Sequence, residues 1–75
     1  MEKELLKRIA INPKIMTGKP VIKGTRIPVV LVLAELANGT KAKELAKGYR
    51  ITERQILTAL RYAQTTVANE EIVTI

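Results

Sequence analysis

The sequence contains no cysteine, no histidine and no serine, and each absence removes a class of site. Without cysteine no disulfide can form, and without cysteine or histidine the usual zinc ligands are missing. The commonest nucleophiles and the commonest general base are missing as well, and the seven acidic residues are scattered along the chain. We therefore expect no enzyme activity and no metal or other cofactor.

Aromatic residues are almost absent, because phenylalanine and tryptophan do not occur and the only aromatic side chains are Tyr49 and Tyr62. The core of this 75-residue chain must therefore consist of isoleucine, leucine, valine and alanine. A domain near this size buries only about 60% of its unfolded surface, which leaves a small margin of stability. Oligomerisation is the remaining support for the fold, so we expect a homodimer or a partner-bound form.

No apolar run is long enough to cross a membrane. The longest one, residues 27–36, is about half a membrane span and contains Pro28. The chain begins with charged residues and lacks the apolar segment and cleavage site of a signal peptide. We therefore expect a cytoplasmic protein without a membrane partner.

Positive charge is present in excess and is unevenly distributed. The net charge is +6, and residues 40–63 contain six basic but only two acidic residues. A concentrated positive charge is what nucleic acid requires of a binding surface. A basic protein with solvated lysines would show the same composition, so the charge alone does not decide between the two interpretations.

The segment 40–63 carries the most complete local signals, and they predict a short helix, a turn and a longer helix. Thr40 is a candidate N-cap of the first helix, and Gly48 is the residue expected to end it in a left-handed conformation. Thr52 and Gln55, three residues apart, fit a capping box at the start of the second helix. Ile51 before the cap and Ile56 after it fit a hydrophobic staple.

The second helix shows one apolar face and one polar face. Apolar residues recur at a spacing of three or four residues and predict the buried side: Ile56, Leu57, Leu60, Ala63 and Val67. We expect the exposed positions to be Arg54, Gln55, Thr58 and Arg61. Two helices joined by a turn of about four residues, the second with basic and amide side chains, are typical of a helix-turn-helix.

The rest of the chain predicts short strands and one more helix, in a single mostly α domain over residues 1–75. Two short strands are expected at residues 9–11 and 20–22. Pro28 suits the first position of a helix. This helix is apolar nearly all round, so we expect it to be buried on several sides. The predicted helices are residues 28–38, 41–47 and 52–68, after strands and a loop in 9–27 and before a candidate terminal strand in 70–75.

The loop over residues 18–28, GKPVIKGTRIP, is rich in glycine and lysine, so a phosphate-binding loop must be considered. The order of residues does not fit, because Lys23 precedes Gly24 instead of following the last glycine, and Pro20 lacks a backbone N–H. A structural corner is the better interpretation. Thr25 and Arg26 would attach this corner to the domain or to a partner.

Duplex DNA is the nucleic acid that the sequence favours. Surfaces that bind RNA or single-stranded DNA stack bases on aromatic rings, and two tyrosines do not provide one. Base contacts are expected near the start of the second helix, from Arg54, Gln55, Thr58 and Arg61. Phosphate contacts are expected from Lys41, Lys43, Lys47 and Arg50. The alternative is that all eight side chains are solvated surface.

The string GKPVIKGTRIPV at residues 18–29 resembles the small prokaryotic family called domain of unknown function 433. The leucine-rich helix, Gly39 and the pattern of apolar residues and tyrosines from Leu45 to Ala63 extend the resemblance to residues 9–63. This resemblance implies a helix-turn-helix fold of the homeodomain-like or winged-helix-like kind, preceded by short strands.

The resemblance also implies a role. Members of the family are regarded as antitoxins of type II toxin–antitoxin pairs, often beside a PIN-like ribonuclease toxin, and such antitoxins usually bind operator DNA as dimers. The toxin contacts expected here lie in the corner and in the tail: Thr25, Arg26, Ile27, Ile72 and Val73. The alternative function is a protein-interaction module, or a stand-alone transcriptional regulator without a toxin.

Overall fold

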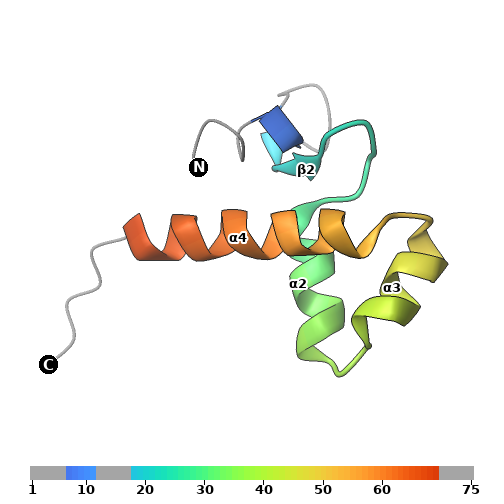
Figure 1. Cartoon of the computed structure of the whole chain (residues 1–75). Helices are drawn as coiled ribbons and strands as arrows, with labels where there is room; N and C mark the ends of the chain where they lie inside the picture. The colour runs from blue at the N-terminus through green and yellow to red at the C-terminus, as the bar shows by residue number, and fades with distance from the viewer. Residues whose placement is uncertain (1–6, 12–17, 70–75) are drawn as a thin grey trace, which may run out of the picture.

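The computed structural model describes residues 7–11 and 18–69, and within them the chain forms two short strands followed by three helices (Figure 1). Strand β1 (Ile9–Ala10) pairs with β2 (Val21–Ile22) in an antiparallel sheet, in which Ile9 faces Ile22. The helices are α2 (Val29–Ala37), α3 (Ala42–Tyr49) and α4 (Glu53–Asn69). The fold is therefore the mostly helical one that the sequence predicts, and the strand at residues 9–10 pairs within its own chain.

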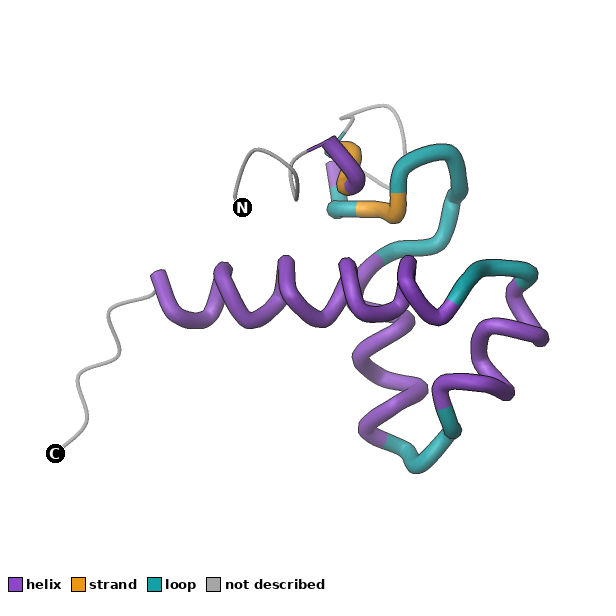
Figure 2. The backbone as a smooth tube through the Cα atoms, in the orientation of Figure 1, coloured by secondary structure: helices purple, strands orange, loops and turns teal. Residues whose placement is uncertain are grey.

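Helix α4 is the element on which the domain is assembled. It packs against α2, α3 and both strands. Figure 2 shows the strand pair on one side of α4, and it shows α3 near the N-terminal end of α4. The C-terminal half of α4 extends beyond the other elements (Figure 1). One hydrophobic core joins all of these elements, with Ile22, Val32, Leu45 and Ile56 among its most deeply buried side chains.

The corner between β2 and α2 is held by its own hydrogen bonds. The Thr25 hydroxyl donates to the Ile22 carbonyl at 2.6 Å and accepts the Ile27 N–H at 3.0 Å. Gly24 has a φ of 80°, as the third position of a type II turn requires. Thr25 therefore attaches the corner to the domain. Attachment to the domain is one of the two options proposed from the sequence.

Helix α2 begins one residue later and is less buried than the sequence predicts. Pro28 is extended, with a ψ of 147°, and precedes the helix as its N-cap. Val29 and Val32 are buried, but Val30 is 55% exposed, so the expectation of burial on several sides is wrong. The helix ends in a Schellman motif at Asn38 and Gly39, since the Thr40 N–H donates to the Glu35 carbonyl at 3.0 Å. This end of the helix is as predicted.

The turn between α3 and α4 differs from the prediction. Gly48 lies inside α3, and the left-handed residue is Arg50, with φ 56° and ψ 43°. The Ile51 N–H donates to the Ala46 carbonyl at 3.0 Å, which closes the end of the helix. Ile51 is thereby placed in the core, so the burial of this side chain explains why the helix continues past the glycine.

The position of Gly48 leads to a testable prediction. A Cβ added at Gly48 would meet no atom within 4 Å, and the backbone there is helical. Gly48→Ala is therefore expected to raise the free energy of unfolding by about 0.5–1 kcal/mol, measured by urea denaturation. Gly39→Ala is the comparison, because Gly39 has a φ of 95° and its replacement should destabilise the domain. If the two variants lose stability alike, the assignment of Arg50 as the left-handed residue is wrong.

Candidate nucleic-acid interface

The start of α4 is fixed by the capping box that the sequence predicts. The Gln55 N–H donates to the Thr52 hydroxyl at 3.0 Å, and the Thr52 N–H donates to the Gln55 Oε1 at 2.8 Å. Ile51 and Ile56 on either side of the cap are both buried in the core, as a hydrophobic staple requires. These contacts set the angle at which α4 leaves the turn.

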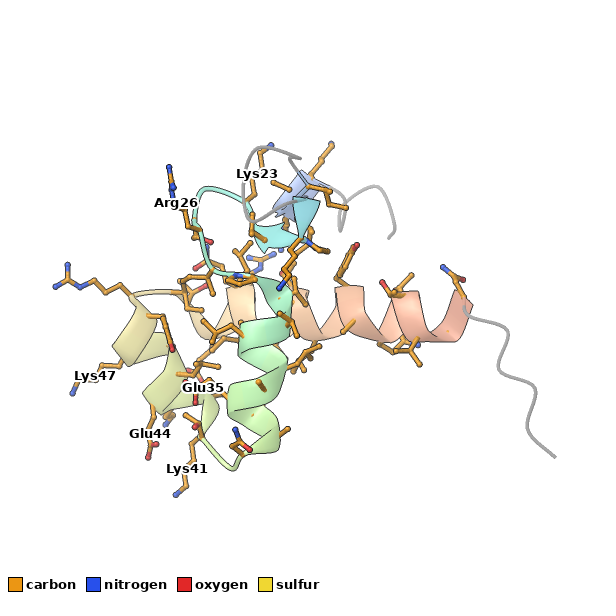
Figure 3. All side chains as sticks on the ribbon, turned by 180° about the vertical axis from the view of Figure 1, so that it is seen from behind. Lys23, Arg26, Glu35, Lys41, Glu44 and Lys47 are labelled. Atoms are coloured by element: carbon orange, nitrogen blue, oxygen red, sulfur yellow. The ribbon has the colours of Figure 1, made fainter. Side chains whose placement is uncertain are left out.

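Helix α3 is joined to α2 through one carboxylate. Glu35 on α2 accepts hydrogen bonds from the Thr40 hydroxyl at 2.9 Å and from the Tyr49 hydroxyl at 3.1 Å. Figure 3 shows Glu35 on the side of α2 that faces α3. The expectation that Thr40 caps α3 is wrong, because Lys41 is the N-cap residue and the Thr40 hydroxyl is bound to Glu35.

The same carboxylate changes the acidity of Tyr49. The hydrogen bond to Glu35 raises the pKa of the Tyr49 phenol above its usual 10.0, and desolvation and the negative charge of Glu35 act in the same direction. The phenol therefore stays protonated, and remains a donor, throughout the neutral range. This contact holds the C-terminal turn of α3 against α2.

All of the basic side chains predicted on the two helices are exposed. They are Lys41, Lys43, Lys47, Arg50, Arg54 and Arg61. Figure 3 shows Lys41 and Lys47 pointing outward from α3. The acidic residue Glu44 lies between them in the sequence. Lys43 and Lys47 are four residues apart and so share one side of the helix.

The polar face of α4 is not placed as predicted. Thr58 is only 6% exposed, and its hydroxyl donates to the Arg54 carbonyl at 3.0 Å. Gln55 is half-buried, and its amide oxygen is used by the cap. Thr58 is too buried to reach the base edges of a duplex, so the candidates for base contacts are reduced to Arg54 and Arg61, with Gln55 at their edge.

The apolar face of α4 is likewise only partly buried. Ile56 and Ala59 are buried and Ala63 packs against the core, but Leu57 is 59% exposed and Val67 is 57% exposed. Leu60 is exposed as well. The physical reason is that the β1–β2 sheet packs on the Thr58 side of α4, and this rotates the buried face away from Leu57.

The partner-binding residues predicted in the corner and the tail have different surroundings. Thr25 and Ile27 are half-buried, and Ile27 packs against the core, whereas Arg26 is exposed and points away from the domain (Figure 3). Ile72 and Val73 lie outside the described residues.

Comparisons with known proteins agree with this fold. Residues 9–63 match the model of the family described as "Protein of unknown function (DUF433)". The chain belongs to the DUF433 family. The match spans the same residues as the resemblance drawn from the sequence, and it includes both strands, α2, α3 and the first two-thirds of α4.

Two proteins are similar to this chain. The crystal structure of a DUF433 member protein from Anabaena variabilis has a TM-score of 0.77 and 29% sequence identity, and the match covers 89% of this chain and 67% of that one. An uncharacterized protein from Archaeoglobus fulgidus is 62% identical over 24 residues, which are 32% of this chain and 67% of that protein. The DUF433 fold is thus shown, and the family description assigns no function.

Among the residues that the structure describes, no helix has both the length and the apolar character needed to span a bilayer.

Proposed function

We propose that this DUF433 protein binds duplex DNA through α3 and α4. The observation that supports the proposal most is that all six basic side chains of the helix-turn-helix segment are exposed, and that they come from both of its helices and the residues next to them. Lys43 and Lys47 on α3 would contact backbone phosphates. In other helix-turn-helix proteins the second helix enters the major groove, and in this proposal α4 does so.

Base recognition in this proposal comes from Arg54 and Arg61. They are seven residues apart, two turns along α4, and so lie on the same side of the helix, about 10 Å apart along its axis. Both are exposed. An arginine that binds the O6 and N7 of guanine through two hydrogen bonds contributes about 1–3 kcal/mol of discrimination. Leu57, exposed on the same helix, would add an apolar contact to a thymine methyl group.

The biological role that we propose is an antitoxin that represses its own promoter and neutralises a PIN-like ribonuclease as a homodimer. It is supported by the family resemblance and by the exposed apolar side chains of Leu60 and Val67, which suit a protein partner. Dimers of helix-turn-helix proteins read two half-sites about 34–36 Å apart, so a second copy would also complete the DNA-binding unit.

A protein-interaction module without DNA binding is the second candidate. An apolar groove of about 340 Å³ between α2 and α4 favours it, lined by Val30, Leu33, Tyr62 and Val67 among others. The two candidates differ in one property. Only the DNA-binding protein would have an affinity for duplex DNA that falls with salt.

Arg54→Ala tests the base-recognition part of the proposal. We expect it to weaken binding to the duplex upstream of the protein's own gene by about 1–3 kcal/mol, with a smaller loss on a scrambled duplex. Fluorescence anisotropy measures both affinities. Arg26→Ala is the control, since Arg26 is an exposed arginine outside both helices. An equal loss on the two duplexes would show that Arg54 contacts phosphate and carries no sequence recognition.

A further inference from the structure

A second cluster of positive charge lies beside the helix-turn-helix, in a pocket of about 320 Å³ between the β1–β2 sheet and the first turns of α4. Its basic lining residues come from three separate segments: Lys7 and Arg8 before β1, Lys23 after β2, and Arg54 in α4. No acidic residue is among the described residues that line it. The charged residues of its described lining are therefore all basic.

The segments that carry these cations are joined by backbone contacts. The Lys23 N–H donates to the Arg8 carbonyl at 2.9 Å, and Ile9 pairs with Ile22 in the sheet. The sheet in turn packs on α4, and the buried Ile22 and Thr58 line the pocket between them. The backbone positions of Arg8, Lys23 and Arg54 are thus fixed relative to one another.

The Gln55 side chain adds hydrogen-bond donors to the pocket. The capping box uses the oxygen of the Gln55 amide, so the two N–H groups of that amide are not needed for it. Figure 3 shows the Lys23 side chain extending outward from the sheet. Rotation of its four-carbon stem would bring the ammonium group over the pocket.

We propose that this pocket binds a phosphate group. A phosphate carries up to two negative charges and several acceptor oxygens, and it can accept hydrogen bonds from several directions. Arginine binds such groups with two parallel N–H donors, and lysine adds a point charge. A volume near 300 Å³ is at the small end of ligand sites, which suits a phosphate with a small organic substituent.

Two sources of phosphate have this chemistry, namely a free phosphate monoester and the backbone of a nucleic acid. The inference does not require the proposed function, because inorganic phosphate can be tested without DNA. A protein that fails to bind a duplex can still bind phosphate in this pocket. The two proposals can therefore fail separately.

The first experiment is a titration of the whole ¹⁵N-labelled chain with inorganic phosphate, at constant ionic strength set with chloride. We expect saturable shifts of the amide signals of Lys23, Thr52, Arg54 and Gln55. Lys7→Gln together with Arg54→Gln should weaken phosphate binding at least tenfold. The matched control is Lys19→Gln with Arg26→Gln, which removes one lysine and one arginine that do not line the pocket and should change the affinity less than about twofold.

Thermal unfolding provides a second measurement. Phosphate at ten times its Kd should raise the Tm by about 5 °C or more in the wild type and in the control. Phosphate also stabilises proteins without binding to a site, by exclusion from their surface. An equal rise in the pocket variant, or amide shifts that never saturate, would overturn the proposal.

Lys7→Gln distinguishes the sources, because Lys7 lines the pocket and lies outside the helix-turn-helix. If this variant loses affinity for both phosphate and a short duplex, and phosphate displaces the duplex from the wild type, the pocket binds the nucleic-acid backbone. If it loses affinity for phosphate alone, the pocket binds a free phosphate compound. Both results support the site, and unchanged phosphate binding by Lys7→Gln and by the double pocket variant contradicts it.

Discussion

Ile56→Ala is expected to lower the free energy of unfolding by about 2–4 kcal/mol. Ile56 is only 1% exposed, and its side chain lies in the core with Leu45 and Val32. It also packs beside Ile51 at the capped start of α4, so its removal would loosen the turn of the helix-turn-helix. Domains of this length are stabilised by only about 4–11 kcal/mol in total. The loss should be visible in urea denaturation as a large fall in the midpoint.

Leu57→Ala is the matched control for this prediction. Leu57 follows Ile56 in the same helix but is 59% exposed, so its truncation should cost less than about 1 kcal/mol. The amino-acid pattern places both side chains on the buried face, whereas the structure separates them. Equal destabilisation by the two variants would mean that α4 buries the face predicted from the sequence pattern, and would contradict the fold described above.

Lys43→Gln together with Lys47→Gln is expected to weaken binding to duplex DNA by about 10- to 100-fold at low salt. Both lysines are exposed on the same side of α3, from which they would contact phosphates. The logarithm of the binding constant falls linearly with the logarithm of the salt concentration, and loss of two phosphate contacts should make this slope less steep by about 2. Anisotropy titrations at several salt concentrations measure the affinity and the slope together.

The loss should be the same on the upstream duplex and on a scrambled one, because phosphate contacts carry no sequence information. Lys19→Gln with Arg26→Gln again serves as the control, since it removes the same net charge from exposed positions outside α3 and α4. If the control weakens binding as much as the lysine variant does, the effect is one of total charge, and α3 does not contact the duplex.

The local features of this fold were predictable from the sequence because each depends on a few neighbouring residues. The capping box of Thr52 and Gln55 and the helix end at Asn38 and Gly39 form as their residue types require. The predicted bounds of the three helices differ from the observed ones by at most two residues. The family resemblance, carried by the corner around Thr25, is confirmed by the family match over residues 9–63.

The failures come from contacts that the local sequence pattern does not contain. Thr58 is buried because the β1–β2 sheet packs on α4, and the periodicity of α4 contains no information about that sheet. The hydroxyl of Thr40 binds Glu35, so it is not available to cap α3. Arg50 takes the left-handed conformation that Gly48 could have adopted, since this places Ile51 in the core.

The candidate site was predictable in its charges and not in its geometry. All six basic residues of the helix-turn-helix are exposed, as solvated or DNA-binding side chains would be. The cations that line the pocket with Arg54 come from segments far from it in the sequence, so no local pattern relates Lys7 to Arg54. The sequence suggested a phosphate site only in the glycine-rich corner, and the order of residues there argued against it.

The most direct test of the central claim is the affinity of the wild-type protein for the duplex upstream of its own gene and for a scrambled duplex, measured by anisotropy over a range of salt. We predict binding at least tenfold tighter to the upstream duplex, and a fall in affinity with salt that corresponds to several phosphate contacts. Weak binding, equal for the two duplexes, would contradict recognition of DNA through α3 and α4.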